Sequence, residues 1–178
     1  KTMYDFESAS RSVAQTQRAL LLGIIKDNQN SVYGNKHNFS KISLVRDFQN
    51  QVPVNSYESI SPYIDQLLLG GKNILTREDP ILFSITSGTT GKSKYIPMNQ
   101  TSRNLKSSVM KLWLYKAGQD HPRMFEGKFL TLVSPEIEGR TQGGIPFGAE
   151  SGHAYKNLPQ AMKNLYIVPY EVFLIHDY

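Results

Sequence analysis

The sequence predicts an α/β fold, in which a β-sheet is flanked by helices. Short apolar runs that are rich in strand formers lie at residues 81–85 and 129–133, and segments with helical spacing of apolar residues lie at 12–27 and 101–118. A loop rich in glycine and hydroxyl residues follows the first run directly. Strands that alternate with helices are typical of α/β architecture. The length of 178 residues is sufficient to bury a core.

The first expected element is an amphipathic helix over residues 12–27, the main part of a leading helical segment at 1–30. Its apolar residues recur at helical spacing and predict a face that covers something larger; they are Val13, Leu20, Leu21, Ile24 and Ile25. A joint rich in glycine and asparagine follows at residues 28–38. Residues 39–51 alternate between helical and loop character.

The next expected helix covers residues 63–69. Ser61 can cap it, Pro62 suits its first turn, and Gly70-Gly71 provide a left-handed stop. Residues 81–85 then predict a buried strand, and residues 95–97 its return strand. The stretch 81–97 is therefore expected to be a strand, a loop and a strand.

The second half of the chain continues the alternation. Thr101 is expected to cap a helix that ends near Gly118, with one apolar stripe against the core; its members are Leu105, Val109, Leu112 and Trp113. Residues 129–133 and 172–175 predict buried strands, 159–165 a short helix, and 139–152 a long loop. Because the chain stops directly after an apolar run, we expect a truncated domain.

Composition excludes several classes of function. The net charge of +5 comes from 20 basic and 15 acidic residues without a dense basic run, which argues against nucleic-acid binding and suits an anionic ligand such as a nucleotide. The absence of cysteine excludes disulfides, thiolate metal sites and a cysteine nucleophile. The longest apolar stretch, at residues 20–25, is too short to span a bilayer. We expect a soluble, cytoplasmic protein without a membrane partner.

The loop at residues 86–94 carries the chemistry. It reads Thr-Ser-Gly-Thr-Thr-Gly-Lys-Ser-Lys. Gly88 and Gly91 permit backbone angles that turn N–H groups toward an anion, and a lysine at the far end supplies a mobile charge. The hydroxyls of Ser87, Thr89 and Thr90 add short donors. This mixture predicts a phosphate cradle.

Two other kinds of loop have features in common with residues 86–94. A hairpin turn rich in glycine, serine and threonine has a similar composition. A Walker loop would need glycine at position 86, where this chain has Thr86, so a mononucleotide kinase or GTPase is disfavoured.

The order of residues in the loop resembles the first nucleotide motif of the adenylate-forming superfamily, Ser/Thr-Ser-Gly-Thr-Thr/Ser-Gly-x-x-Lys. Acyl-CoA ligases of that superfamily usually have proline before the lysine and glycine after it, whereas Ser93 and Tyr95 stand here. The continuation Lys94-Tyr95-Ile96-Pro97 resembles the auxin-responsive promoter family of acyl-acid amido synthetases, including its bacterial members.

Further segments, each weaker, extend this resemblance over residues 30–155. They are Tyr33-Gly34-Asn35-Lys36-His37, Val52-Pro53-Val54, Tyr57-Glu58, Pro62-Tyr63-Ile64, Gly127-Lys128 and Gly143-Gly144-Ile145-Pro146-Phe147-Gly148.

The resemblance implies that residues 1–178 are the incomplete N-terminal part of a large adenylate-forming domain, with the C-terminal domain absent. It implies a reaction in which ATP, with Mg²⁺ held by residues outside this chain, activates a carboxylic acid as an acyl-adenylate. An amine, usually an amino acid, then takes the acyl group. Ser87, Gly88, Thr89, Thr90 and Gly91 would hold phosphate, and Lys94 would be the catalytic cation. No residue of this chain is assigned to a metal.

Other residues were weighed against structural roles. Glu136 and Glu138 have a spacing that suits magnesium, but a solvated face is the more common reason for it. The four histidines, His37, His121, His153 and His176, fit no ligand spacing and are expected to be structural or exposed. Residues 139–152 suit either the lining of an acyl pocket or an ordinary loop. Trp113 and Tyr115 suit an aromatic wall, with core packing preferred.

The sequence thus favours an acyl-acid amido synthetase. An acyl-CoA ligase is a rival within the same chemistry. A non-catalytic ligand-binding or scaffold domain, which keeps the loop only for its turn geometry, is the alternative from another class.

Overall fold

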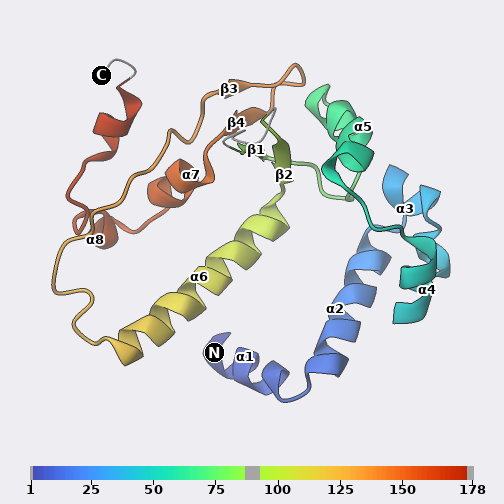
Figure 1. Ribbon diagram of the computed structural model, residues 1–178, viewed down its shortest axis with the longest axis horizontal. Helices are drawn as coiled ribbons and strands as arrows, with labels where there is room; N and C mark the ends of the chain where they lie inside the picture. The colour runs from blue at the N-terminus through green and yellow to red at the C-terminus, as the bar shows by residue number, and fades with distance from the viewer. Residues whose placement is uncertain (1, 87–92, 176–178) are drawn as a thin grey trace. The chain divides into compact units, whose positions relative to one another are not determined.

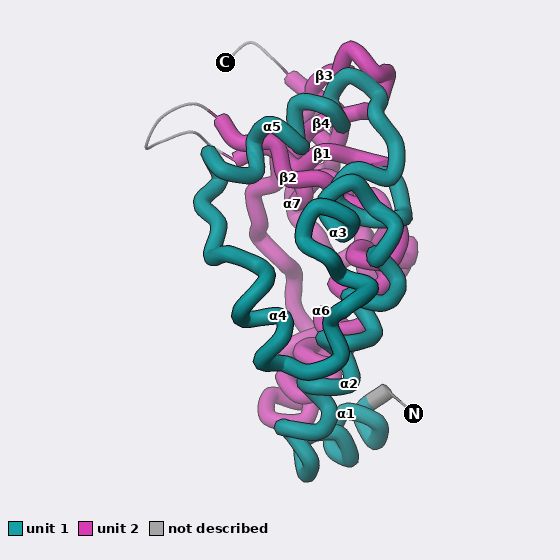
Figure 2. The backbone as a smooth tube through the Cα atoms, turned by 90° about the vertical axis from the view of Figure 1, so that its right-hand side faces the viewer, with its two compact units in different colours: residues 1–79 teal, residues 80–178 magenta. Residues whose placement is uncertain are grey.

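The structure is a computed structural model, and it describes residues 2–86 and 93–175. Contacts divide the chain into two compact units, residues 1–79 and residues 80–178 (Figure 2). Helices make up the first unit, and a small mixed sheet with helices makes up the second (Figure 1). This confirms the α/β class that the sequence predicts. No helix in the described ranges is both long enough and apolar enough to cross a membrane.

The first unit contains more helices than the sequence predicts. They are α1 (Thr2–Ser10), α2 (Val13–Asp27), α3 (Val32–Lys36), the 3-10 helix η1 (Phe39–Lys41), α4 (Val45–Gln51) and α5 (Tyr57–Leu68). The helix expected at 12–27 is confirmed as α2. It buries only part of its apolar face, because Ile25 packs with Phe39 and Ile42 while Leu20 and Ile24 are exposed.

The glycine in the Tyr33-Gly34 segment is required by packing. The Ser31 hydroxyl is fully buried; it donates to the Asn28 carbonyl at 2.9 Å and accepts from Gly34 N at 2.9 Å. A Cβ on Gly34 would lie 2.1 Å from the Asn28 carbonyl oxygen. Any side chain at position 34 would therefore force the start of α3 away from the end of α2.

The start of α5 differs from the prediction. Ser56 caps the helix, and Pro62 lies in its interior. Proline has no N–H to give to the carbonyl of Glu58, four residues earlier. The Ser61 hydroxyl donates to that carbonyl at 2.9 Å instead. The Ser61-Pro62 pair is thus accommodated in the helix, because the serine replaces the missing backbone donor.

The end of α5 matches the prediction. Gly70 has φ of 92°, and Gly71 N donates to the Gln66 carbonyl at 2.8 Å while Gly70 N donates to the Leu67 carbonyl at 3.0 Å. This pair of bonds is the Schellman motif, in which a glycine in the left-handed region satisfies the last carbonyls of the helix.

The sheet of the second unit has the strand order β2-β1-β4-β3. Its strands are β1 (Leu82–Ile85), β2 (Tyr95–Met98), β3 (Gly139–Arg140) and β4 (Pro146–Gly148). β1 is antiparallel to β2 and parallel to β4, and β3 is antiparallel to β4. The strands expected at 81–85 and 95–97 are confirmed.

Pro97 explains why β2 can be an edge strand of this sheet. Pro97 pairs with Phe83, and Thr86 N bonds to the Lys94 carbonyl further along the same ladder. Because hydrogen-bonded and non-hydrogen-bonded pairs alternate, Pro97 occupies a position whose N–H would point away from β1. The missing donor therefore costs no ladder bond and makes the outer edge a poorer template for a further strand.

Helix α6 (Gln100–Asp120) departs from the sequence prediction in its cap and in its burial. Asn99 rather than Thr101 is the cap, since its side chain accepts from Ser102 N at 2.8 Å. The apolar stripe expected against the core is largely exposed: Leu105, Val109 and Trp113 are 63%, 57% and 60% accessible. In Figure 1 the helix runs away from the sheet, which leaves most of its length outside the core of this unit.

Two expected strands are not formed. Residues 129–133 make only an isolated bridge between Phe129 and Tyr166, and Leu130 and Leu132 are 72% and 83% exposed. Residues 172–175 fall within or next to the 3-10 helix η2 (Tyr170–Leu174). Conversely, the loop expected at 139–152 contains β3, β4 and the start of α7 (Glu150–Lys156). The short helix expected at 159–165 is confirmed as α8 (Gln160–Lys163).

Candidate functional site

The two ends of the predicted phosphate loop are held together where β1 ends and β2 begins. Thr86 N donates to the Lys94 carbonyl at 3.1 Å, and Lys94 N donates to the Thr86 hydroxyl at 3.0 Å. Lys94 is half-buried at the first residue before β2. Of the predicted site residues only Lys94 is described, because Ser87, Gly88, Thr89, Thr90 and Gly91 lie outside the described residues.

Aromatic side chains support the hairpin below the loop. Phe83 on β1 is fully buried, and the Tyr95 ring on β2 meets it edge-on at 6.1 Å between centroids. Tyr95 also meets Phe147 of β4 edge-on at 5.5 Å. Edge-to-face contacts of this kind stabilise aromatic pairs beyond simple burial. The three strands that surround the loop base are therefore joined by one aromatic cluster.

The parallel pairing of β1 and β4 brings a second segment to the same edge of the sheet. Ser84 is in register with Gly148, so the carboxyl ends of both strands lie at this edge. Open α/β sheets bind ligands outside the carboxyl ends of their strands. The loop begins where β1 ends, and α7 begins two residues after β4 ends. The expected ligand edge therefore includes Gly148 and Ala149 as well as the loop.

The glycines of the 139–152 segment allow close packing against residues 134–138. A Cβ on Gly148 would lie 2.2 Å from the Glu136 carbonyl oxygen, and one on Gly152 would lie 2.1 Å from the Ser134 carbonyl oxygen. Two backbone bonds run alongside: Glu138 N donates to the Phe147 carbonyl at 2.8 Å, and Ala149 N donates to the Pro135 carbonyl at 3.0 Å. The interpretation of an ordinary long loop is therefore wrong.

A cluster of ionisable side chains is centred on Glu136. Its Oε1 lies 2.6 Å from His153 Nδ1, and its Oε2 lies 2.9 Å from Lys156 Nζ. The side chains of Glu136 and His153 are 15% and 14% exposed. Burial alone would raise the pKa of Glu136, but the hydrogen bonds and charges of Lys156 and His153 outweigh burial and lower that pKa. The same bond to Glu136 raises the pKa of Lys156.

This cluster corrects the sequence view of Glu136. A solvated face or a magnesium ligand was considered, yet both carboxylate oxygens face nitrogen donors of α7. Within residues 2–86 and 93–175, no group of three or more histidine or acidic side chains is suited to hold a metal ion. His153 and Lys156 were not identified from the sequence, because their role depends on a partner 17 residues or more away along the chain.

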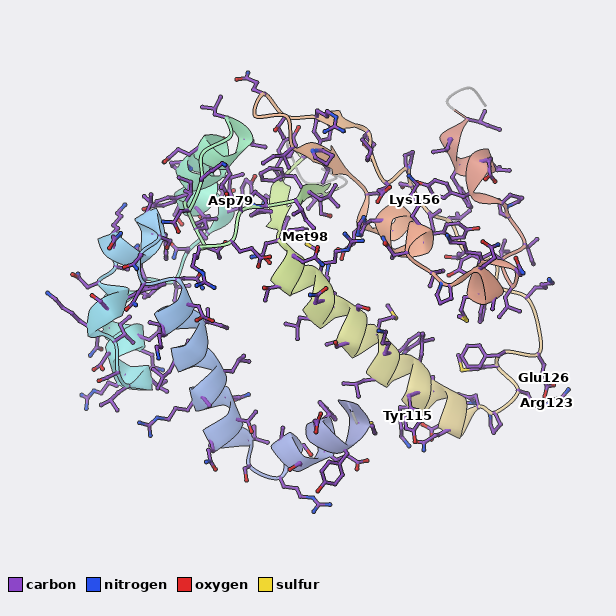
Figure 3. The ribbon with its side chains drawn as sticks, turned by 180° about the vertical axis from the view of Figure 1, so that it is seen from behind. Asp79, Met98, Tyr115, Arg123, Glu126 and Lys156 are labelled. Atoms are coloured by element: carbon purple, nitrogen blue, oxygen red, sulfur yellow. The ribbon has the colours of Figure 1, made fainter. Side chains whose placement is uncertain are left out.

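Trp113 and Tyr115 are both exposed, so the preferred interpretation of core packing is wrong for this unit. Figure 3 shows Tyr115 in the distal half of α6. Their exposure leaves the alternative role, an aromatic wall for a bound acid, as a prediction.

The first unit has an apolar hollow between its helices, lined among others by Leu21, Ile24 and Phe48. Its polar groups are bonded within the unit. Asn28 Oδ1 accepts from Arg77 N at 2.9 Å, and the Tyr33 hydroxyl accepts from Asn55 Nδ2 at 2.8 Å. Because Asn28 and Tyr33 of this hollow are bonded within the unit, we interpret the hollow as a packing gap between the helices and not as a ligand site.

A family profile described as "GH3 family N-terminal domain" matches residues 2–178. The chain belongs to the GH3 family.

Curated relatives of this GH3 chain are plant amido synthetases. It is 24% identical over 159 residues to the jasmonoyl-L-amino acid synthetase JAR6 of Nicotiana attenuata. The aligned region covers 88% of this chain and 27% of that relative. It is 27% identical over 179 residues to the indole-3-acetic acid-amido synthetase GH3.5 of Arabidopsis thaliana. This alignment covers 96% of this chain and 29% of that relative. The chain therefore spans less than a third of the length of these two relatives.

A solved structure shares the fold of this GH3 chain. The GH3.15 acyl acid amido synthetase superposes with a TM-score of 0.78 at 20% identity, over 97% of this chain and 30% of that one. At 20% identity this match shows the fold alone, and the fold is of the α/β class that the sequence predicts.

Proposed function

We propose that this chain is the N-terminal, nucleotide-binding part of an acyl-acid amido synthetase. The observation that carries the proposal is the clamped β1–β2 hairpin, in which Thr86 and Lys94 hold together the two ends of a loop of phosphate-binding composition in a chain of the GH3 family. The names of the relatives supply the reaction class. The ATP, acid and amino-acid assignments belong to the longer protein.

In the proposed reaction, a carboxylate oxygen of the acid attacks the α-phosphorus of ATP. The bond from that phosphorus to the bridging oxygen breaks, and pyrophosphate leaves. The amine of an amino acid then attacks the acyl carbonyl, and AMP leaves. This chain would contribute the backbone and hydroxyl donors of Ser87, Gly88, Thr89, Thr90 and Gly91, together with the Lys94 ammonium, to the phosphates of ATP. Magnesium would neutralise phosphate charge through ligands outside this chain.

The remaining sequence-based assignments join this proposal. We expect a cytoplasmic enzyme without nucleic-acid or membrane partners. Kinship with the bacterial members of the family is a prediction from the loop continuation Lys94-Tyr95-Ile96-Pro97, whereas the relatives cited above are plant proteins.

The test is acid-dependent release of pyrophosphate by the full-length protein over a panel of carboxylic acids. The panel includes indole-3-acetic acid and jasmonic acid, for which the relatives are named. Release with at least one acid, followed by an acyl–amino acid product, supports the proposal. Transfer to coenzyme A but to no amino acid would identify an acyl-CoA ligase, and no release with any acid would favour a binding or scaffold domain.

A further inference from the structure

Polar side chains from three segments of the second unit form a continuous hydrogen-bonded network. Arg103 of α6 donates from Nη2 to Asn157 Oδ1 at 2.7 Å, and Asn157 Nδ2 lies 3.2 Å from His153 Nε2. His153 Nδ1 and Lys156 Nζ then meet the two oxygens of Glu136 at 2.6 and 2.9 Å. The network thus links α6 to α7, and α7 to the 134–138 segment.

The donors and acceptors of this network define which ring nitrogen of His153 faces Glu136. The Arg103 guanidinium can only donate, so Asn157 must present its oxygen to Arg103 and its NH₂ group to His153. His153 Nε2 then accepts, which places the ring proton on Nδ1, where it is donated to Glu136. The network therefore selects Nδ1 as the ring nitrogen of His153 that donates to the Glu136 carboxylate, and Nε2 as the one that faces Asn157.

The charges around Glu136 agree with this assignment. Lys156 on α7 supplies the ammonium that balances the carboxylate. The nearby turns of α6 and α7 contribute one more ion pair, between Lys106 and Glu150. The lowered pKa of Glu136, which follows from its Lys156 and His153 bonds despite burial, keeps the carboxylate charged.

Glu136 occupies the centre of the segment that supports β4. Its backbone N donates to the Tyr170 hydroxyl at 2.8 Å. On its two sides, the Pro135 carbonyl accepts from Ala149 N and Glu138 N donates to the Phe147 carbonyl. Among the described residues, β4 pairs with β1 at Phe83–Phe147 and Ser84–Gly148. The position of β4 therefore depends on the 134–138 segment as much as on its neighbour in the sheet.

From these contacts we infer that Glu136 is a positioning residue. Its carboxylate holds α7 against the 134–138 segment and so fixes the carboxyl end of β4 beside the strand that enters the nucleotide loop. The inference rests on the proposed function for its catalytic consequence. Its structural part concerns this chain alone.

Four variants separate this role from general stability. Glu136→Ala removes the carboxylate, and Glu136→Gln keeps its shape without its charge. His153→Asn retains a side-chain N–H near the position of Nδ1, whereas His153→Leu removes every donor. Glu138→Ala is the matched control, because Glu138 is an exposed glutamate of the same segment.

The first measurements use NMR on the full-length protein. ¹⁵N shifts of the imidazole should report the Nδ1–H tautomer of His153. The amides of Glu138 and Ala149 should exchange on the order of tenfold faster in Glu136→Ala than in wild type, and the amide of Ala149 should exchange at the wild-type rate in Glu138→Ala. An Nε2–H tautomer, or wild-type exchange in both Glu136→Ala and His153→Leu, would overturn the inference.

The second measurement is pyrophosphate release by the full-length protein. Misplacement of reacting groups by about 1 Å can cost on the order of 100-fold in rate, so kcat should fall by about that factor in Glu136→Ala and His153→Leu. His153→Asn should remain near wild type, Glu136→Gln should be intermediate, and the KM for ATP should change less than kcat. Wild-type kcat in a folded His153→Leu protein would refute the positioning role. If wild type itself releases no pyrophosphate, the proposed function fails. The His153 tautomer and the amide exchange rates then still test whether Glu136 holds α7 against the 134–138 segment.

Discussion

Lys94 is held at the base of the loop by its backbone atoms, which leaves the role of its side chain open to direct test. Because both bonds to Thr86 use other atoms than Nζ, Lys94→Ala should preserve the hairpin. We expect adenylation to slow by about 100- to 1000-fold, the usual effect of removing one preorganised donor of positive charge.

The measurement for Lys94→Ala is pyrophosphate release by the full-length protein, with Lys72→Ala as control because Lys72 is an exposed lysine of the first unit. An unchanged rate in Lys94→Ala would remove Lys94 from the mechanism.

The lowered pKa of Glu136 also predicts that the free energy of unfolding depends on pH. Its pKa in the folded chain lies below the ordinary value of 4.5, so the unfolded chain binds a proton first as the pH falls. The stabilisation is complete above about pH 4.5 and is lost as the pH falls through the lower, folded pKa. We expect wild type to lose stability relative to Glu136→Gln over this range, because only wild type must protonate a paired carboxylate.

The measurement is the free energy of unfolding at pH 6 and at two values below 4.5 for wild type and Glu136→Gln. A comparison is needed because the pKa of Asp47 is also lowered, by backbone N–H groups of Ser43 and Leu44, and contributes with the same sign. Parallel pH curves for the two proteins would show that Glu136 does not contribute.

At the scale of elements, α5 offers a test of how a helix accommodates an internal proline. Ser61→Ala should lower stability by about 0.5–1.5 kcal/mol, because the Glu58 carbonyl loses its donor. Pro62→Ala should raise stability by about 1–3 kcal/mol, since alanine restores the backbone bond. In the Pro62→Ala background, Ser61→Ala should cost less.

A double-mutant cycle by denaturant unfolding measures this coupling between Ser61 and Pro62. Equal costs of Ser61→Ala in both backgrounds would mean that the Ser61 hydroxyl does not substitute for the missing N–H.

The strands show where prediction from sequence succeeded among the elements. β1 and β2 follow from local signals, a β-branched and aromatic run next to a loop, and both are present. Residues 129–133 carry an equally apolar run, yet they make only the single bridge to Tyr166. A strand requires a partner at the right distance, and composition does not specify one.

At the scale of the whole molecule, exposed apolar side chains predict self-association of the 178-residue chain. Large apolar patches on a soluble protein commonly mark interaction surfaces or aggregation sites. Leu105, Val109 and Trp113 lie at helical spacing on α6 and are 63%, 57% and 60% exposed. Residues 172–175 do not form a strand, so they offer no strand edge for association.

We therefore expect Val109→Lys combined with Leu105→Lys to reduce the average molar mass in solution, as measured by light scattering over a range of concentrations. Lys replacements on exposed Ser107 and Gln119 serve as charge controls on the same helix. Equal masses for wild type and the α6 variant would exclude this face as the site of association.

The sequence by itself determined what depends on neighbours along the chain. The α/β class, α2, the glycine stop of α5 and the β1–β2 hairpin all follow from periodicity and turn chemistry, whereas phosphate binding by the loop stays a prediction. Tertiary structure alone decided what depends on partners far apart in sequence. It placed Gly148 and Gly152 against the 134–136 backbone, joined Glu136 to His153 and Lys156, and left the α6 stripe exposed. The physical reason is that burial, ion pairing and strand pairing each require two segments to meet, and a local sequence pattern describes only one of the two.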